Sequence, residues 1–418
     1  MKKLIFISFG FLFTFSSVVL FSQNVSHYND NWMFADQHSY NFTSGTPSYV
    51  AGTAVSDPNT EGVSAISDGS GNILFYSDAE SVYDANNNPM PNGNGTINGH
   101  ISSRNACLIT KIPGDCDRYY LFSLQEPIPG SPSLLELRYS VIDMSLNGGL
   151  GDVVAAQNNV LIYTASDLTE KMISVQKGLT EDYWIIVRKN LSDEFLSFEV
   201  TSAGINNTPV VSLVSSNTYS YTPTPVVIPS VGWLAASPYN DAIIETSGFT
   251  NSCLYDFDNL TGVLTLSEVV IPTGIFGTDI PYGVEFSPSG DVLYVSWIEG
   301  AANTYISSFD ITVGPPNIAG TRQDYLIANG PAEYGALVKG PDGKIYGTRT
   351  STTQLTVINT PENYLAPNII APGFNPSPGV SDIGMPNITY YYHPDNFIDT
   401  LAGNDRFVCK SFQAEIGA

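Results

Sequence analysis

The pattern of hydrophobic and polar positions repeats one unit several times along the chain. In each copy a glycine precedes a short apolar segment, a turn of Gly, Asp, Asn and Pro follows, and a second apolar segment completes the unit, as in EGVSAISDGSGNILFYSD, VGWLAASPYNDAIIETSG, YGVEFSPSGDVLYVSW and YGALVKGPDGKIYGTR. Two apolar runs joined by tight-turn residues predict a β-hairpin. The later leading glycines, Gly232, Gly283, Gly335 and Gly384, recur at steps of about 50 residues, which is typical of propeller blades or another stacked array.

Two further segments follow each hairpin. CLYDFDNLTG from Cys253 and TYISSFDITVG from Thr304 alternate Tyr or Phe with polar residues, which predicts a half-buried strand. A segment such as VLTLSEVV from Val263 supplies another strand. Four antiparallel strands per unit predict the blade of a β-propeller.

The number of blades depends on two weaker copies and on the chain ends. NACLITKIPGDCDRYYLFSL from Asn105 and EKMISVQKGLTEDYWIIVRK from Glu170 keep the strand, turn, strand rhythm without the leading glycine. The remnant Gly384–Tyr392 offers one more first strand, and NWMFAD, YNFTSG and TPSYVAG near the N-terminus offer its partners. We therefore predict an all-β, seven-bladed propeller of four-stranded antiparallel blades over residues 23–395, closed by N- and C-terminal strands.

The first residues, MKKLIFISFGFLFTFSSVVLFSQ, combine two lysines with a long apolar stretch that ends at the small residue Ser22. This pattern predicts a secretory signal peptide over residues 1–22. An uncleaved anchor is the alternative, because the apolar stretch approaches the length of a membrane span. With cleavage, we expect an extracellular protein with no membrane span in the mature chain.

The charge balance excludes one class of partner. The formal net charge is −24 and the pI is about 4.2, whereas a nucleic-acid binder needs a basic patch to displace counterions. Because charged residues make up only 13% of the chain, much of the surface must be neutral and polar. Such a surface suits an extracellular protein that needs solubility without strong fields.

The chain has four cysteines: Cys107, Cys116, Cys253 and Cys409. Export permits disulfides. Cys107 and Cys116 lie on opposite arms of one hairpin, but a turn near Gly114 would pair Cys107 with about Leu121, so the two are not directly opposed. A bridge between them stays open as a minority alternative. No CxxC motif or nearby histidine completes a tetrahedral metal set, and we predict neither a metal nor a cofactor.

Catalytic motifs are missing from the sequence. It contains no GxSxG elbow, no HExxH and no phosphate-binding glycine loop. Asp78 and Glu80 are the nearest local carboxylate pair and could share one strand face, but among 40 acidic residues such a pair arises readily by chance. The scattered histidines are interpreted as surface or turn residues: His27, His38, His100 and His393. We predict that the chain is not an enzyme, and we assign no catalytic, cofactor-binding or metal-binding residue.

Two other groups of residues have a competing functional interpretation. Asp84, Asn86 and Asn88 alternate like the first ligands of a calcium loop, but the glycine at the sixth position and the distal glutamate are missing, which favours a solvated turn. Tryptophans in or beside predicted strands could stack on sugars, but packing between blades is favoured: Trp32, Trp184, Trp233 and Trp297.

Five phrases in order carry a resemblance to a known family. NWMFADQHSYNFTSGTP, TEGVSAISDGSGNILFYSDAESVYDANNNPMPNG, YSVIDMSLNGGLGDV, KMISVQKGLTEDYWIIVRK and IGMPNITYYY resemble the N-terminal propeller region of large surface proteins of gliding bacteria, which commonly carry a gliding-motility-associated C-terminal domain. The resemblance runs from about Asn31 to Tyr392. It implies a propeller exported by type IX secretion and attaches no established chemistry to any residue.

The end of the chain is interpreted as a linker, residues 396–402, followed by a truncated module, residues 403–418. AGNDRFVCKSFQAEIGA resembles the first strands of an immunoglobulin-like or PKD-like module, which needs about 80 to 100 residues. The family resemblance implies further modules, a sorting domain for type IX secretion, and a partner for Cys409 in the missing part. It also implies a candidate O-glycosylation site at Thr400.

Together these observations predict an exported cell-surface protein whose propeller is a recognition or adhesion module for a polysaccharide or a surface protein, in gliding or attachment. A secreted polysaccharide-active enzyme with carboxylates at the propeller channel is the alternative. A rigid structural spacer is a third possibility.

Overall fold

The computed structural model describes residues 27–389, except 104, 106, 126–134, 166–167, 190–191, 215–231, 248–250, 272–278, 300–302, 330–334, 349–353 and 375–383. The predicted signal peptide, the linker, the C-terminal module, His393, Thr400 and Cys409 lie outside the described residues.

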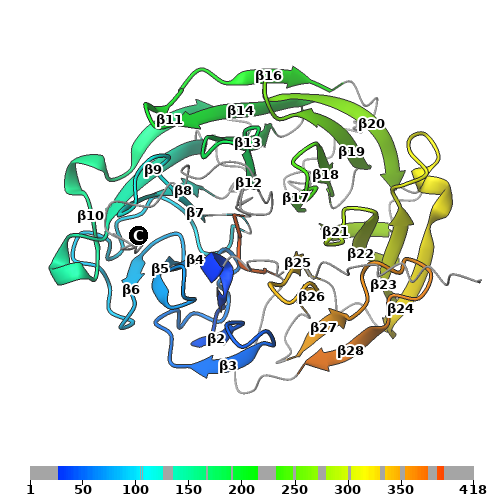
Figure 1. Cartoon of the computed structure of the whole chain (residues 1–418), viewed down its shortest axis with the longest axis horizontal. Coiled ribbons are helices and arrows are strands. Elements are labelled where there is room, and N and C mark those ends of the chain that lie inside the picture. Colours follow the sequence, from blue (N-terminus) through cyan, green and yellow to red (C-terminus); the bar gives the residue numbers. More distant parts are fainter. Residues whose placement is uncertain are drawn as a thin grey trace, which may run out of the picture.

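Seven antiparallel sheets surround a central axis, so the predicted seven-bladed propeller is confirmed (Figure 1). We name the blades A to G in chain order. Blade A contains β1 (Asn31–Met33), β2 (His38–Asn41) and β3 (Ser48–Ala51), and blade B contains β4 (Ser64–Ser67), β5 (Ile73–Ser77) and β6 (Val82–Asp84). Blade C contains β7 (Cys107–Lys111), β8 (Arg118–Leu124), β9 (Leu135–Asp143), β10 (Asp152–Val153) and β11 (Val160–Ala165).

The other four blades follow the same inner-to-outer order. Blade D contains β12 (Leu168–Gln176), β13 (Tyr183–Lys189), β14 (Glu194–Thr201), β15 (Gly204–Ile205) and β16 (Val210–Leu213). Blade E contains β17 (Leu234–Ala236), β18 (Ala242–Glu245), β19 (Ser252–Asp258) and β20 (Val263–Ile271). Blade F contains β21 (Asp279–Phe286), β22 (Val292–Glu299), β23 (Asn303–Asp310) and β24 (Gln323–Asn329), and blade G contains β25 (Leu337–Lys339), β26 (Ile345–Gly347), β27 (Leu355–Ile358) and β28 (Ile369–Phe374).

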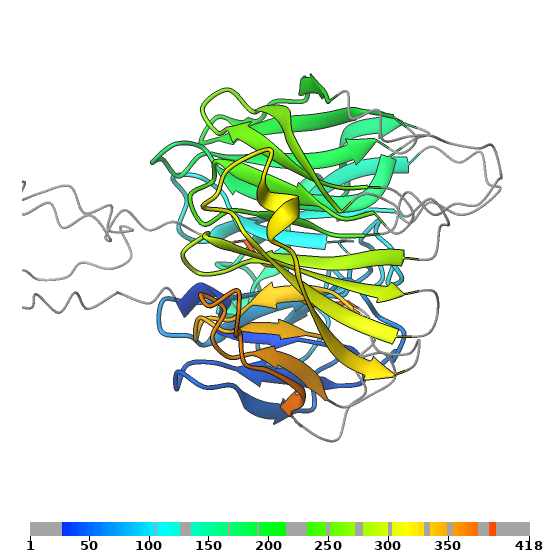
Figure 2. The ribbon, with the colours of Figure 1, turned by 90° about the vertical axis from the view of Figure 1, so that its right-hand side faces the viewer.

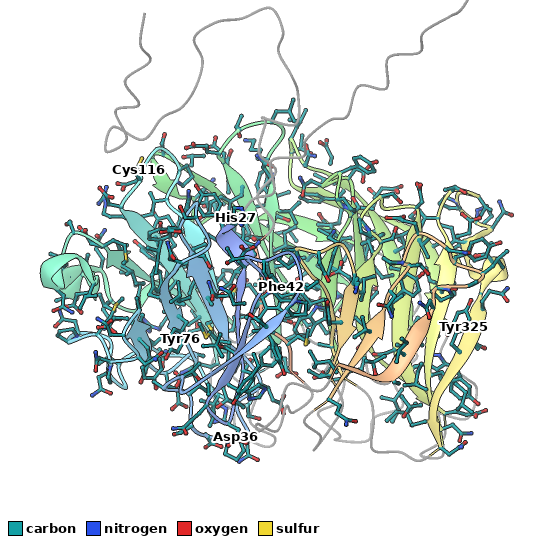
Figure 3. The ribbon with its side chains drawn as sticks, turned by 60° about the horizontal axis from the view of Figure 1, so that its bottom comes forward. His27, Asp36, Phe42, Tyr76, Cys116 and Tyr325 are labelled. Atoms are coloured by element: carbon teal, nitrogen blue, oxygen red, sulfur yellow. The ribbon has the colours of Figure 1, made fainter. Side chains whose placement is uncertain are left out.

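Only short 3-10 helices accompany the described strands: η1 (His27–Asn29), η2 (Asn147–Gly149), η3 (Ala155–Gln157) and η5 (Ile318–Thr321). Strands run between the two faces of the ring (Figure 2). Cys116 and His27 lie toward one face and Asp36 toward the other (Figure 3).

Stacking of the blades explains the continuous apolar runs in the second strands. Six of the seven residues of β13 are buried, because neighbouring blades cover both faces of the sheet. The outermost strand β24 instead has exposed residues on both faces. The packed faces form apolar clusters that cross from blade to blade, such as Leu254 of blade E with Val295 and Phe309 of blade F.

The leading glycine of the repeat marks a close approach between blades. A Cβ built on Gly283 would lie 2.4 Å from the carbonyl oxygen of Gly335 in the next blade. A Cβ built on Gly384 would lie 2.0 Å from the carbonyl oxygen of Glu61 in blade B. Since real Cβ atoms do not approach oxygen so closely, the innermost segments can meet only where no side chain stands between them.

The chain ends close the ring together, with residues 384–389 lying beside blade B. The Asn387 N–H donates to the carbonyl oxygen of Val63 at 2.8 Å, and Ser64 Oγ donates to the carbonyl oxygen of Asn387 at 2.9 Å. Met385 is buried in one cluster with Trp32 of blade A. This C-terminal segment is not assigned to a regular strand, because Pro386 has no N–H to donate to a ladder.

The expectation of four strands in every blade is wrong for blades A and B, which have three assigned strands each. After β6 the chain enters the segment NNNPMPNGNG, whose prolines cannot donate to a ladder. It folds back on its own strand instead, with the Met90 N–H donating to the carbonyl oxygen of Val82 at 2.8 Å and the Val82 N–H to that of Gly93 at 3.0 Å.

Candidate functional site

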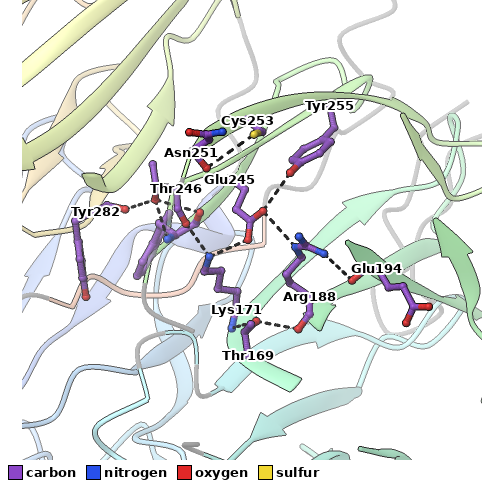
Figure 4. A network of polar contacts seen from close by, with 11 residues as sticks. Thr169, Lys171, Arg188, Glu194, Glu245, Thr246, Asn251, Cys253, Tyr255 and Tyr282 are labelled. Carbon is purple, nitrogen blue, oxygen red and sulfur yellow. Dashed lines mark hydrogen bonds and ion pairs between the residues drawn. The ribbon is translucent and has the colours of Figure 1, made fainter. Parts of the chain in front are cut away.

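The densest group of buried charges in the described part of the chain lies between blades D and E (Figure 4). Lys171 is on the innermost strand β12, Arg188 is near the end of β13, and Glu245 ends β18. Their side chains are 0%, 1% and 4% exposed. We call these three residues the D–E charge cluster.

Both carboxylate oxygens of Glu245 accept hydrogen bonds. Lys171 Nζ donates to Oε1 at 2.8 Å and also to the carbonyl oxygen of Thr246 at 2.7 Å. Arg188 Nε donates to Oε2 at 3.3 Å, and the Tyr255 hydroxyl donates to the same oxygen at 3.2 Å. A second guanidinium nitrogen of Arg188 donates to the carbonyl oxygen of Glu194 at 3.0 Å. The cluster therefore joins strands of two blades.

Comparison of blade D with blade F shows which hydrogen bonds the D–E charge cluster replaces. In blade F, Ser296 Oγ accepts a hydrogen bond from the Gly283 N–H at 2.9 Å and donates to the carbonyl oxygen of Gly335 in the next blade at 2.7 Å. Lys171 stands seven residues before the turn glycine Gly178, as Gly283 stands seven before Gly290. Blade D thus has a lysine at the position of the leading glycine.

Arg188 correspondingly stands where blade F has Ser296. Met172, which follows Lys171, pairs with Val187, and Val284, which follows Gly283, pairs with Val295, so Arg188 and Ser296 each come directly after that partner. The β12 register shifts between Leu168 and Met172. Strand β21 has a shorter register shift at the corresponding place, between Pro281 and Val284, so β12 has one more residue than β21 outside the paired register.

Opposing effects set the protonation of the cluster. Burial alone would raise the pKa of Glu245, but the charges of Lys171 and Arg188, with hydrogen bonds from Lys171 and Tyr255, hold it below its ordinary value. Burial lowers the pKa of Lys171 against the raising effect of Glu245. Burial also raises the pKa of the nearby Cys253 thiol to about 12, so that thiol is neutral at pH 7. Both oxygens of the Glu245 carboxylate are thus engaged by buried donors, and the protonated Cys253 thiol is not the thiolate that nucleophilic catalysis uses.

Other buried carboxylates are also engaged in structural contacts. Glu285 accepts from the N–H of Lys339 in blade G at 3.0 Å. Glu268 of blade E accepts from the N–H groups of Ile318 and Ala319 in blade F at 3.1 and 2.8 Å. These carboxylates bind backbone donors of the next blade, as expected for buried charge that must be compensated.

The C-terminal segment makes polar contacts with the innermost strands β7 and β12 and with η1. Thr389 Oγ1 donates to the carbonyl oxygen of Ile109 at 3.1 Å, and Ser174 Oγ donates to Thr389 Oγ1 at 2.9 Å. Asn29 Nδ2 donates to the carbonyl oxygen of Thr389 at 2.8 Å. Hydroxyl and amide groups, rather than facing carboxylates, make these contacts.

The alternative in which Asp78 and Glu80 share one strand face does not hold. Both lie in the turn between β5 and β6, where Asp78 Oδ1 accepts from the N–H groups of Glu80 at 3.0 Å and Ser81 at 2.7 Å. Asp78 Oδ2 accepts from the Tyr83 hydroxyl at 2.9 Å. Asp78 is therefore a turn-capping residue, and its chemistry is local.

The Asp84 segment is a turn, as favoured. Asp84 Oδ1 accepts from the N–H groups of Asn86 and Asn88 at 2.8 and 2.9 Å, so the presumed ligand oxygen binds backbone. Among the described residues no group of three or more His, Cys, Asp or Glu side chains is placed to hold a metal ion.

The four tryptophans pack in the core and are at most 6% exposed: Trp32, Trp184, Trp233 and Trp297. This confirms that they pack rather than stack on sugars. His27 pairs with Asp30 at 2.6 Å and His100 accepts from the Ser102 N–H at 3.2 Å. The expectation of a surface or turn position is wrong for His38, which is buried on β2 and stacks on Phe34 with ring centroids 5.2 Å apart.

A Cys107–Cys116 bridge does not form. Cys107 and Cys253 are free and buried, and Cys116 is disulfide-bonded. Cys107 lies opposite Ser123 rather than Leu121, because six residues, 112–117, separate the two strands. The lack of direct opposition between Cys107 and Cys116 is confirmed.

Comparisons with known proteins identify no family for this chain. No family model matches the chain, and no curated protein matches it. Among solved structures, the chain is similar to a candidate 6-phosphogluconolactonase from Bacteroides uniformis, with 13% identity, a TM-score of 0.47, and coverage of 85% of this chain and 98% of that one. It is also similar to the periplasmic gluconolactonase of Pseudomonas aeruginosa, with 14% identity, a TM-score of 0.41, and coverage of 66% and 73%. Likeness this distant says nothing about the activity of this chain.

Within the described residues, no helix is long and apolar enough to cross a membrane.

Proposed function

We propose that this chain is an exported cell-surface protein whose propeller is a recognition module for a polysaccharide or a surface protein. The observation that carries the proposal is that buried charged side chains of the ring are engaged in structural contacts. The D–E charge cluster, Glu268 and Glu285 all bind neighbouring blades, and Thr389 of the C-terminal segment bonds to the innermost strands β7 and β12. The interior of the described ring is built for rigidity, which leaves its exterior for function.

The sequence supports the remaining parts of the proposal. The signal-peptide pattern at residues 1–22 supports export, and the resemblance to propellers of gliding-bacterial surface proteins supports type IX secretion and display. Low charge content with a strongly acidic balance favours a soluble surface module without affinity for nucleic acid.

The test is binding of the purified, fluorescently labelled chain to native producing cells, to their extracellular polysaccharide and to their growth surfaces. We expect saturable binding to at least one of these, competed by unlabelled chain. Heat-unfolded chain is the control, because recognition requires the folded exterior. Absence of saturable binding to all three surfaces would refute the proposal.

One observation favours the enzyme alternative. Buried ionisable groups with shifted pKa values, such as Lys171 and Glu245, cluster at active sites more often than elsewhere. If the D–E charge cluster is catalytic, the native chain releases reducing ends from the polysaccharide and Glu245→Gln abolishes the release. We expect no release from either protein, because both Glu245 oxygens accept hydrogen bonds from buried donors and the side chain is itself buried.

A further inference from the structure

Three large apolar side chains stand in solvent on neighbouring turns of blades D and E. Leu179 lies in the β12–β13 turn, Tyr239 in the β17–β18 turn and Leu260 in the β19–β20 turn. They are 68%, 65% and 65% exposed. We call these three residues the turn patch.

The three turns are held together as one surface by Asn259. Its Nδ2 donates to the carbonyl oxygen of Asn240 at 3.0 Å, and its Oδ1 accepts from the Gly178 N–H at 3.3 Å. Its carbonyl oxygen accepts from Trp184 Nε1 at 2.7 Å. A Cβ built on Gly178 would lie 3.0 Å from Leu260 Cδ2, so the turns of the two blades touch. The patch is preorganised and would lose little entropy on binding.

The repeat shows that the turns do not need these side chains. The blade E turn reads SPYND and the corresponding blade F turn reads SPSGD, so Ser289 stands where blade E has Tyr239. In both turns the first serine hydroxyl binds within the turn: Ser237 Oγ to Asp241 and Ser287 Oγ to the Val292 N–H. Turn geometry is therefore satisfied without an aromatic residue. One edge of the Tyr239 ring lies near the Gly290 turn of blade F, where an added Cβ would be 3.4 Å from Tyr239 Cε2, but most of the side chain is in solvent.

Acidic residues flank two of the three turns along the chain, and one of them, Glu181, accepts from the Gly114 N–H of blade C at 2.7 Å. Asp258 begins the Leu260 turn, and hydrogen bonds from the Thr261 hydroxyl and the Leu260 N–H hold its pKa below the ordinary value, so it stays ionised. Glu181 and Asp182 follow Leu179, and the nearby cation Lys177 is paired with Glu199. The free charge at the edge of the patch is negative.

We propose that the turn patch docks a polypeptide segment that combines cationic and apolar side chains. Charge complementarity selects a basic partner, and the exposed leucines select an apolar one. A glycan fits less well, because two of the three side chains are aliphatic and lack both a ring face and hydrogen-bonding groups. The inference rests on the recognition function proposed above, and it adds the surface and the class of partner.

The test uses a peptide of about 18 residues built from Leu and Lys as an amphipathic helix, with a control peptide in which Ser replaces every Leu at unchanged charge. Binding to the purified chain is measured by fluorescence anisotropy at about 0.15 M salt, where long-range attraction is screened. The patch variant carries Leu179→Ser, Tyr239→Ser and Leu260→Ser. The matched control is Leu213→Ser, since Leu213 is 73% exposed but lies on the outer strand β16.

We expect the Leu/Lys peptide to bind the native chain and the Leu213→Ser control alike, and the patch variant about tenfold more weakly or less. The Ser/Lys peptide should bind all three proteins weakly and equally. Calorimetry should give a negative heat-capacity change for the native chain that shrinks in the patch variant. Unchanged melting of the variant confirms that it is folded.

Equal affinity of the patch variant and the native chain for the Leu/Lys peptide would overturn the proposal, as would an equal loss in Leu213→Ser. If native cells bind the patch variant as well as the native chain, the docking proposal fails and the recognition function stands. If no surface binds either protein, the recognition function fails, whatever the peptide does.

Discussion

Substituting Glu245 by Gln tests the D–E charge cluster directly. The amide keeps the volume of the side chain but removes the negative charge that compensates Lys171 and Arg188, which are 0% and 1% exposed. Gln also has one acceptor oxygen where Glu245 uses two. Removing one partner of a buried ion pair costs about 3 kcal/mol or more, because the remaining charge is left in a low-dielectric interior.

Urea denaturation followed by tryptophan fluorescence measures this loss. With an m-value of about 3 kcal/mol/M, the midpoint should fall by about 1 M. The control is Glu299→Gln, because Glu299 is exposed at the end of β22 and its loss should change stability by about 0.5 kcal/mol or less. A midpoint shift for Glu245→Gln no larger than for Glu299→Gln would refute the reasoning.

The pH dependence of the free energy of unfolding gives a second measurement on the D–E charge cluster. Because the folded-state pKa of Glu245 lies below its ordinary value, its ionised form adds stability above about pH 4.5, and this contribution is lost as the pH falls through the folded pKa. The deficit of Glu245→Gln should therefore shrink below about pH 4.5. Replacing all three charges by Lys171→Met, Arg188→Leu and Glu245→Leu should recover most of the stability, since well-packed apolar side chains can replace a buried ion cluster.

Three further predictions follow from single sites. Gly384→Val should lower the free energy of unfolding by about 2 kcal/mol or more, because the new Cβ would overlap a carbonyl of blade B. The control is Gly320→Val, whose Cβ would meet nothing within 4 Å. It should have a much smaller effect in the same urea titration. Burial lowers the pKa of His38, so as the pH drops below about 6.5 the unfolded chain binds a proton at this residue before the folded chain does. The melting temperature should therefore fall from pH 7 to pH 5. His38→Phe should flatten that part of the pH profile. Burial raises the pKa values of the Cys107 and Cys253 thiols. A maleimide at pH 7 should therefore leave both thiols unlabelled in the native chain and label both in denaturant. Rapid labelling of either thiol in the native chain would contradict its burial.

The repeat made the architecture predictable from sequence. The leading glycines Gly283 and Gly384 both lie against the backbone of another blade, and they could be aligned by the repeat without knowledge of the fold. The repeat did not predict that blades A and B have only three assigned strands each. Outer strands make few contacts and have weak patterns, and the prolines after β6 replace ladder bonds by turn bonds.

Other differences between the sequence analysis and the structure concern Asp78, Glu80 and the D–E charge cluster. Asp78 and Glu80 were misplaced because alternation was extended through a turn that Asp78 itself caps. The D–E charge cluster was missed because Lys171, Arg188 and Glu245 are far apart in sequence, and their pairing follows only from the ring. A signal was present: EKMISVQKG has lysine at the glycine position, and a charge there needs a buried partner.

Surface exposure on living cells tests the central claim most directly. Intact cells that produce the protein natively are labelled with an antibody raised against the propeller, and the mass of the labelled protein is measured. An exported surface module predicts labelling of unbroken cells, with removal of the epitope by external protease. Labelling that appears only after lysis would contradict the account.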